Sequence, residues 1–337
     1  MKCQVLILSV FLSAISSLYA QQYTLKFATV APEGSTWMNV MNEYDAAIRK
    51  ESGGRMGFKV YAGAVQGDEK AVLKKIRIGQ IHAGGFTGVA MGEIAPLVRI
   101  LDTPFLVRSS AEADYLYTTF NQDFEEAFSE GGYVLLGWAE VGFVYVFTNS
   151  MITKPEDLKS LKMWVWEGDP VAETAFSVLG LRPIPLSLEN VRTSLQTGLV
   201  NAFYISPYAA IALQWYTCAK YIVDVPLTCA AGAVLISKKQ FDPLPKDLQD
   251  ILLVNGKKYM AKLTELSRRD NAKAMEEFKK QGITFIKASE QDVQYYMNAG
   301  NQARKELVGK NYSQEFLTRV ETALTTYRKT NSGKNGR

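Results

Sequence analysis

Aromatic side chains are concentrated in the segment 154–215, at or near the ends of short apolar runs that glycine and proline separate. Their flat apolar faces suit an uncharged small molecule, whereas acid–base or nucleophilic chemistry needs ionisable groups. The segment is therefore either a candidate ligand site or part of the apolar core. The aromatic residues concerned are Trp164, Trp166, Phe203, Tyr204 and Tyr208.

The same segment alternates predicted strands with predicted helices. A helix is predicted to begin at Asp169-Pro170, because Asp is a favoured N-cap and Pro fits the first helical position. The stretch 182–186 contains two prolines and is predicted to be extended. Further helices are predicted over 187–198 and from Ser206-Pro207 onward. This β-α-β-α order predicts a parallel sheet with helices on its faces, which binds ligands at the carboxyl ends of its strands.

The ionisable residues show no catalytic pattern. His82 is the single histidine, and it lies in a glycine-rich predicted strand without metal-ligand spacing around it. No H-E-x-x-H, CxxC, G-x-S-x-G or phosphate-binding glycine loop occurs in the sequence. We expect no catalytic residue, no metal site and no cofactor, and therefore a protein that is not an enzyme.

The first residues have the pattern of a secretory signal. Lys2 precedes the apolar run Val5–Ile15, and small residues follow up to Ala20. The run is shorter than the roughly 20 residues that span a bilayer, so a membrane anchor is the weaker interpretation. We expect residues 1–20 to be a signal peptide that is cleaved after Ala20 on export.

The composition is that of an ordinary globular protein. The chain has 337 residues, of which 47% are hydrophobic and 21% charged, and a formal net charge of +4. Basic residues are dispersed among acids, so no nucleic-acid groove is indicated. Cys218 and Cys229 follow the signal, and both a disulfide and two free thiols remain open.

Strand and helix patterns also precede and follow the aromatic segment. From Leu248 to Phe278 the apolar residues fall on one helical stripe, which Gly282 ends. At about 1.5 Å per residue such a helix reaches roughly 50 Å, enough to cross two lobes. The alternative is two helices with a break between them at Gly256. The predicted strands outside the aromatic segment are 23–30, 58–62, 81–86, 134–138, 143–148, 233–237 and 283–286, and the predicted helices are 37–51, 68–78, 110–130 and the remainder after 286.

Several runs together resemble one protein family over residues 23–310. In order, these runs are LKFATVAPEGSTW, YAGAVQGDEKAVLKKIRIGQIHAG, VRILDTPFLVRSSAEA, DLKSLKMWV and VAETAFSVLGLRPIPLSLENVRTSLQTGLVNAF. None is specific alone, but their order and spacing are similar to the DctP-type solute receptors of TRAP (tripartite ATP-independent periplasmic) transporters. The resemblance implies a periplasmic protein.

The resemblance also implies an α/β fold of the two-lobe, type II-like periplasmic-binding class. Each lobe would be a mixed or parallel sheet flanked by helices, with a long helix across both and closure by hinge motion. We expect the crossing strands near 142–148 and 228–233. The expected first lobe comprises 21–143 and 233–255, the second comprises 144–232 and 256–310, and 311–337 form a C-terminal helix and tail.

The ligand site departs from the family at two positions. The family resemblance implies arginines that clamp an organic acid, and the corresponding residues here are Trp164 and, near the hinge, Val144. Tryptophan cannot imitate the charge-assisted fork of a guanidinium, and a desolvated carboxylate without a partner is costly. We therefore expect a hydrophobic ligand. The alternative is an acid receptor that uses a displaced cation such as Arg192 or Lys220, and an enzyme on the same fold is the third possibility.

Two alternatives stay open for individual residues. Trp164 and Trp166 alternate on one strand and share a face, which could be core instead of cleft. Phe203 and Tyr204 point to opposite faces, so only one is expected to line the cleft. Replacing Trp164 by Arg is expected to abolish apolar binding and leave the fold intact. The full set of candidate ligand contacts is Trp164, Val144, Phe203, Tyr204, Leu188, Phe86, Thr87, Gln66, Asp68, Glu33, Trp37, Trp166 and Tyr208.

The partners implied by the resemblance are membrane permease subunits, to which the receptor would deliver its ligand. The aromatic replacements resemble a branch of the family that also works with a periplasmic tetratricopeptide-repeat lipoprotein.

Overall fold

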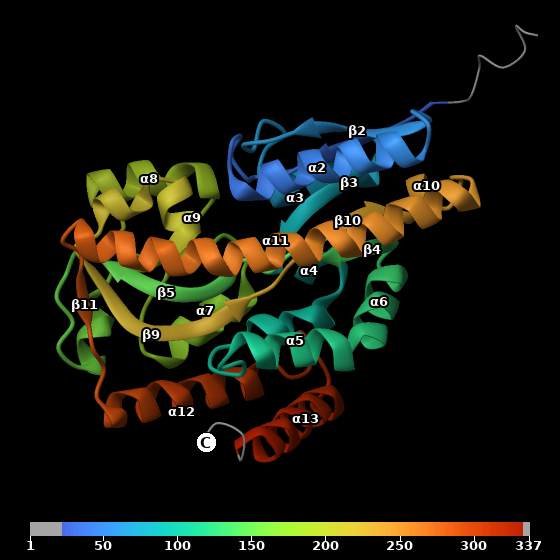
Figure 1. The fold of residues 1–337 in the computed structure, drawn as a ribbon. Helices are drawn as coiled ribbons and strands as arrows, with labels where there is room; N and C mark the ends of the chain where they lie inside the picture. The colour runs from blue at the N-terminus through green and yellow to red at the C-terminus, as the bar shows by residue number, and fades with distance from the viewer. Residues whose placement is uncertain (1–21, 333–337) are drawn as a thin grey trace, which may run out of the picture.

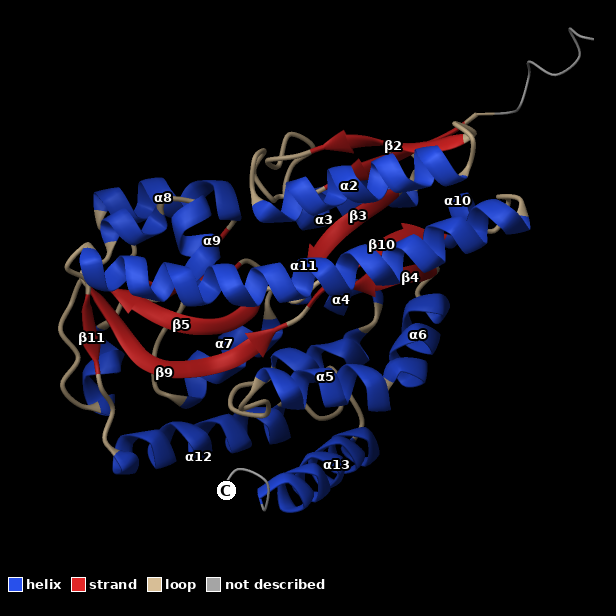
Figure 2. Cartoon of the chain, in the orientation of Figure 1, coloured by secondary structure: helices blue, strands red, loops and turns tan. Residues whose placement is uncertain are grey.

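The computed structural model describes residues 22–332, and the expected signal peptide lies outside them. The chain forms two lobes that each contain a twisted sheet covered by helices, with one long helix across both (Figures 1 and 2). This arrangement confirms the predicted two-lobe α/β fold. None of the described helices is both long and apolar enough to cross a bilayer.

The first lobe contains a five-stranded sheet in the order β2-β1-β3-β10-β4. The strands β1, β2 and β3 are parallel, whereas β10 runs antiparallel to both of its neighbours. Its strands are β1 (Tyr23–Ala28), β2 (Met56–Tyr61), β3 (Ala83–Thr87), β4 (Tyr133–Trp138) and β10 (Gly232–Ser237). Its helices are α2 (Thr36–Glu51), α3 (Glu69–Arg77), α4 (Gly88–Ile94), η1 (Pro96–Asp102), α5 (Ser110–Thr119), α6 (Asn121–Glu130) and the short α10 (Lys238–Phe241).

The interior strand β10 contributes to the apolar packing on both faces of this sheet. All six of its residues are buried, as expected for a strand covered on both faces. Val234 packs in the apolar cluster under α2, and Leu235 packs in the cluster on the other face, with α4 and α6. The apolar run 233–237 was therefore a reliable strand signal.

The second lobe contains a four-stranded sheet in the order β11-β9-β5-β8 and a parallel pair, β6-β7. Its strands are β5 (Gly142–Thr148), β6 (Trp164–Trp166), β7 (Ile184–Leu186), β8 (Ala202–Ile205), β9 (Tyr221–Ala230) and β11 (Thr284–Ile286). Its helices are η2 (Pro155–Ser160), α7 (Pro170–Val178), α8 (Leu188–Thr197), α9 (Pro207–Ala212), η3 (Trp215–Cys218) and α12 (Glu290–Glu306), while α13 (Gln314–Ser332) packs against α5.

Besides the long helix, two strand connections cross between the lobes, and they lie side by side. The connection from β4 to β5 passes Ala139 and Val141, whose N–H groups donate to Gly232 O (2.7 Å) and Ala230 O (3.0 Å). The connection from β9 to β10 is therefore hydrogen-bonded to its neighbour along the hinge. Paired connections of this kind are where two lobes can hinge toward each other.

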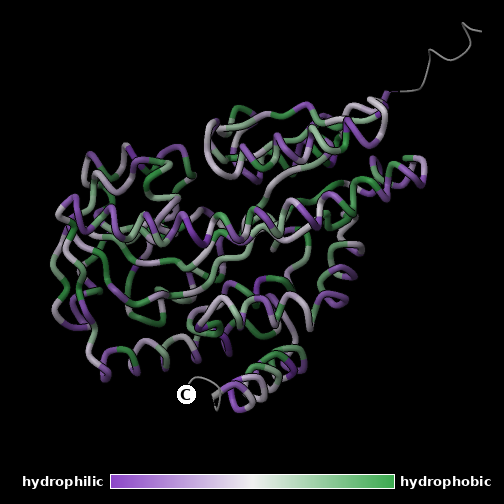
Figure 3. The backbone as a smooth tube through the Cα atoms, viewed as in Figure 1, coloured by the Kyte–Doolittle hydropathy of each residue, from purple (hydrophilic) through white to green (hydrophobic). Residues whose placement is uncertain are grey.

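The long helix α11 (Lys246–Lys280) is continuous over 35 residues. It contacts α2 and β4 in the first lobe and α9 and β5 in the second, and hydrophilic and hydrophobic residues alternate along it (Figure 3). Gly256 does not break it. A Cβ at Gly256 would collide with the backbone oxygen of Leu136 in β4, so glycine permits close packing of helix on sheet.

Three local predictions need correction. The helix predicted over 110–130 is divided at Phe120 into α5 and α6. The strand β9 was predicted only near its end, because Pro226 interrupts its apolar pattern. Trp215 and Tyr216, predicted to extend the helix after Pro207, lie in the separate turn η3, because Gln214 adopts a left-handed backbone conformation with φ 58°.

Candidate functional site

A cavity of about 140 Å³ lies between the two lobes. It is bounded by η1 and the β3–α4 junction of the first lobe, and by β6, α7, β8, β9 and α12 of the second. A second hollow of about 180 Å³ adjoins it and shares six wall residues with it. The shared residues are Thr87, Val141, Trp166, Leu188, Ile205 and Ser206. The strands β6 and β8 end at or next to these walls, as the β-α-β-α order predicted. The prediction of one parallel sheet was wrong, however, because β6 pairs in parallel with β7 in a separate sheet and β8 pairs antiparallel with β5.

Nine of the thirteen predicted contacts line this space. The central cavity is lined by Val144, Trp164, Trp166, Tyr204, Leu188 and Thr87. The adjoining hollow is lined by Trp37, Phe86 and Tyr208 in addition to the shared residues. These positions place the side chains at the cavity, and their part in ligand binding stays a prediction.

Trp164 belongs to both the core and the cavity wall. It is only 2% exposed, and its Nε1 donates to Leu186 O at 3.1 Å. Its ring stacks on Tyr204 with centroids 5.4 Å apart and meets the face of Trp215 edge-on at 5.0 Å. The two alternatives left open by the sequence are therefore compatible. Its neighbour Trp166 lines both hollows, and its buried Nε1 has no hydrogen-bond partner in the described structure.

Four predicted contacts lie outside the walls. Phe203 is fully buried and stacks on Phe147 with centroids 5.0 Å apart, because strand alternation points it away from Tyr204. Asp68 accepts from Ala71 N (2.8 Å) as the N-cap of α3. Gln66 Oε1 accepts from Lys75 Nζ at 2.9 Å, and Glu33 is exposed in a turn.

The cations proposed from the sequence also lie elsewhere. Arg192 and Lys220 are exposed, and neither lines either hollow. The cation that does line the central cavity is Arg99 of η1, which is 3% exposed. Sequence reasoning missed it, although an arginine and an aspartate in the otherwise apolar run VRILDTPFL signal a buried pair.

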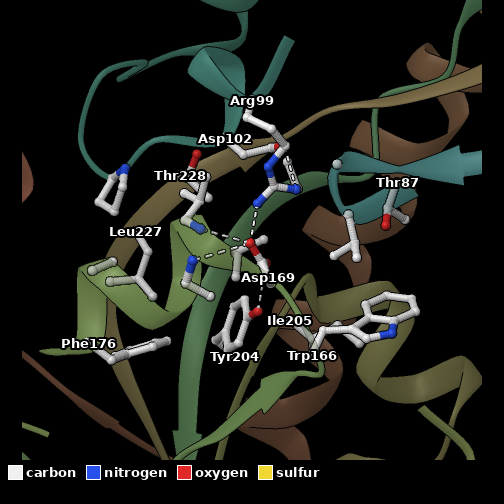
Figure 4. A pocket seen from close by; sticks show the side chains of 18 of the residues that line it. Thr87, Arg99, Asp102, Trp166, Asp169, Phe176, Tyr204, Ile205, Leu227 and Thr228 are labelled. Atoms are coloured by element: carbon white, nitrogen blue, oxygen red, sulfur yellow. Dashed lines mark hydrogen bonds and ion pairs between the residues drawn. The ribbon is translucent and has the colours of Figure 1, made fainter. Parts of the chain in front are cut away.

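Arg99 is held by two aspartates (Figure 4). Its Nη2 pairs with Asp169 Oδ1 of the second lobe, and its Nη1 lies 3.3 Å from Asp102 Oδ2. Asp169 Oδ1 also accepts from Val171 N (3.1 Å) and Ala172 N (3.3 Å), since Asp169 caps α7 as predicted. Tyr204 Oη donates to Asp169 Oδ2 at 3.3 Å. Asp102 Oδ1 accepts from the hinge N–H of Ala231 at 2.9 Å.

Burial controls the protonation of these groups. It raises the pKa of Asp102 to about 6, although Arg99 and the Ala231 N–H favour the carboxylate. Burial opposes the charge of Arg99, but Asp169 and Asp102 outweigh it and raise the pKa of the guanidinium. Burial also raises the pKa of Glu69, in the adjoining hollow, to about 7, although hydrogen bonds from Thr87 favour the carboxylate. The cavity walls thus carry more acid than base.

Several polar atoms at the central cavity have no hydrogen bond among the described residues. They are Arg99 Nε, Asp102 Oδ2, Trp166 Nε1 and Thr228 Oγ1, and all belong to wall residues. Buried polar atoms are usually satisfied, so their clustering here is typical of a site that receives a polar group of a ligand. No group of acidic, histidine or cysteine side chains in residues 22–332 could hold a metal ion, and Cys218 and Cys229 are both free.

Residues 27–311 match the family described as bacterial extracellular solute-binding protein, family 7 (DctP). The chain belongs to this family. This membership confirms the resemblance seen in the sequence. No comparison bears on the lipoprotein-associated branch, which stays a prediction.

Curated relatives match over most of their length. A solute-binding protein of Verminephrobacter eiseniae is 26% identical, with 79% of this chain and 80% of that protein covered. The 2,3-diketo-L-gulonate-binding periplasmic protein YiaO of Escherichia coli is 25% identical, with 86% and 88% covered.

Solved structures share the fold. A TRAP periplasmic solute-binding protein from Ochrobactrum anthropi superimposes with a TM-score of 0.82 at 22% identity, covering 94% of this chain and 99% of that one. The sugar-acid-binding protein DctPAm from Advenella mimigardefordensis, in complex with galactonate, gives 0.85 at 19% identity, covering 91% and 99%. A Pseudomonas putida protein with bound D-glucuronate gives 0.81 at 22% identity, covering 88% and 96%.

Proposed function

We propose that this protein is the periplasmic receptor of a TRAP-type transporter, and that it captures a hydrophobic small molecule between its lobes for delivery to membrane permease subunits. The observation that carries the choice of ligand is the charge of the central cavity. Its charged wall residues are Arg99, Asp102 and Asp169, and they are paired with one another. The other walls are mainly aliphatic and aromatic.

An apolar ligand fits the remaining surface. The apolar lining includes Trp164, Trp166 and Tyr204 of β6 and β8, together with Phe105, Phe176, Leu179, Leu227 and Tyr296. Burial of apolar area contributes about 25 cal/mol per Å². A ligand with one neutral polar group could use the unpartnered atoms of Trp166 and Thr228.

The second candidate is an organic-acid receptor. It is favoured by the relatives: YiaO is named for binding 2,3-diketo-L-gulonate, and solved neighbours hold glucuronate or galactonate. In this alternative Arg99 would be the displaced cation, and it would have to leave Asp169 or Asp102 to meet a carboxylate. That exchange is the physical difficulty of the acid hypothesis.

Native mass spectrometry of the gently purified protein separates the two candidates. A bound apolar molecule, with no stabilisation of the protein by sugar acids in a thermal shift assay, supports the first. A dose-dependent rise in melting temperature with galactonate or glucuronate, and no copurified apolar molecule, supports the second.

Further expectations follow from the receptor proposal. We expect export to the periplasm after removal of residues 1–20, and no turnover of ester or phosphate substrates. A tetratricopeptide-repeat lipoprotein is proposed as an additional partner, which copurification would test.

A further inference from the structure

We infer that Asp169 occupies, at Arg99, the place that the carboxylate of an acid ligand would take, and that with Asp102 it makes the receptor selective against acids. Asp169 then supplies from within the chain the charge contact that joins the two lobes. This inference rests on the proposed function and assigns its selectivity to named residues.

The geometry of Asp169 is that of a fully engaged anion. Its Oδ1 accepts hydrogen bonds from Arg99 and from two N–H groups at the start of α7, and its Oδ2 accepts one from the hydroxyl of Tyr204. The carboxylate of a ligand would be bound by the same kinds of donor: a guanidinium, backbone N–H groups and a hydroxyl. The site is thus built for a carboxylate, and the chain fills it with its own.

The second aspartate prevents a further anion from binding. With Asp102 ionised, one guanidinium faces two carboxylates, so an incoming acid meets a net negative charge in a desolvated setting. Space is short as well. A Cβ at Gly88 would collide with both Asp102 Oδ2 and Arg99 Nη1, so the backbone of α4 closes over this ion pair.

The ion pair between Arg99 and Asp169 also joins the two lobes, which the hinge allows to separate. Arg99 belongs to the first lobe and Asp169 to the second. A neighbouring contact between lobes is neutral: Thr36 N donates to Tyr208 Oη at 3.0 Å. In a receptor closed by an acid, the ligand's charge would draw the lobes together, whereas here the chain carries both charges. Closure therefore does not require an anionic ligand.

The test is Asp169→Asn, alone and with Asp102→Asn. Asparagine caps helices about as well as aspartate, so α7 keeps its start while Arg99 keeps only Asp102 as a counter-ion. The probes are galactonate and hexanoate, measured by titration calorimetry, and the ligand-free shape is measured by small-angle X-ray scattering. The matched control is Asp123→Asn, whose ion pair with Arg319 (2.7 Å) lies away from the cavity, between α6 and α13.

We expect Asp169→Asn to bind at least one acid probe about tenfold or more tightly than the wild type, and the double variant to bind it more tightly still. The ligand-free Asp169→Asn protein is expected to have a larger radius of gyration, while Asp123→Asn matches the wild type in both respects. If Asp169→Asn does not fold, Asp169→Ser, whose hydroxyl can also cap α7, takes its place and must gain acid binding.

Folded variants that neither gain affinity for an acid nor open would overturn the inference. The proposed function is tested separately, since it fails if the wild type holds no apolar molecule. If the wild type holds an apolar molecule but the variants do not bind acids, the receptor proposal stands and the role given to Asp169 is wrong.

Discussion

Replacing Glu69 by Gln should abolish one component of the pH dependence of stability. Glu69 is 2% exposed at the start of α3. Its Oε1 accepts from Thr87 N at 2.9 Å, and its Oε2 accepts from Thr87 Oγ1 at 3.0 Å. Glutamine can keep both contacts, because its amide oxygen accepts from the N–H and its NH₂ donates to the hydroxyl. The change therefore removes the titration with little change in shape.

The magnitude follows from the raised pKa. Burial moves the pKa of Glu69 from 4.5 to about 7 in the folded protein, and each pKa unit corresponds to about 1.4 kcal/mol. Because the folded state binds the proton more tightly than the unfolded state, its stabilisation is complete below pH 4.5 and is lost as the pH rises through 7. Relative to Glu69→Gln, the wild type should gain about 3 kcal/mol between pH 8 and pH 4.5.

Urea unfolding of both proteins from pH 4.5 to pH 8 measures this difference. Other titrating groups, Asp102 among them, are present in both proteins and cancel in the comparison. Parallel stability curves for the two proteins would refute the reasoning, because they would mean that Glu69 is not held in a desolvating environment.

Substitutions at three further positions test the packing of the site and the fold. Trp164→Ala should destabilise the protein by about 3–5 kcal/mol in urea unfolding. Trp164→Arg should fail to fold instead of only losing its ligand, since the ring is 2% exposed and a charge there would be buried. The milder Trp164→Phe should fold and release the copurified apolar molecule. Unchanged stability of Trp164→Ala would contradict the conclusion that the Trp164 ring packs in the core. Gly256→Ala should lower the melting temperature despite the better helix propensity of alanine, because the added methyl meets Leu136 O, and a rise would show that α11 is free to shift. Tyr208→Phe should enlarge the ligand-free radius of gyration while leaving each lobe folded, since it removes the acceptor of the Thr36 N–H across the cleft, and an unchanged scattering profile would assign closure to other contacts.

The fold was largely accessible from the sequence, because its elements carry strong local signals. β10 is a short, continuously buried run, and α11 carries an apolar stripe at helical spacing. The division at Phe120 and the strand β9 were missed for a common reason. Both depend on what packs against them, and the local pattern alone does not contain that information.

The candidate site was accessible only in part. Strand ends placed Trp166 and Tyr204 near each other, because β6 and β8 start at the parallel bridge Met163–Ala202 and run in the same direction. Asp169 was predicted only as the cap of a helix. The pairing of Asp169 with Arg99 was not accessible. The two residues lie 70 positions apart on different lobes, and their contact exists only because the lobes meet.

The most direct test of the account is a crystal structure of the wild-type protein with the ligand that copurifies with it. The account predicts electron density for an apolar molecule against Trp166, Tyr204 and Leu227, with Arg99 still paired with Asp169. Density for a carboxylate on Arg99, with Asp169 displaced, would contradict it.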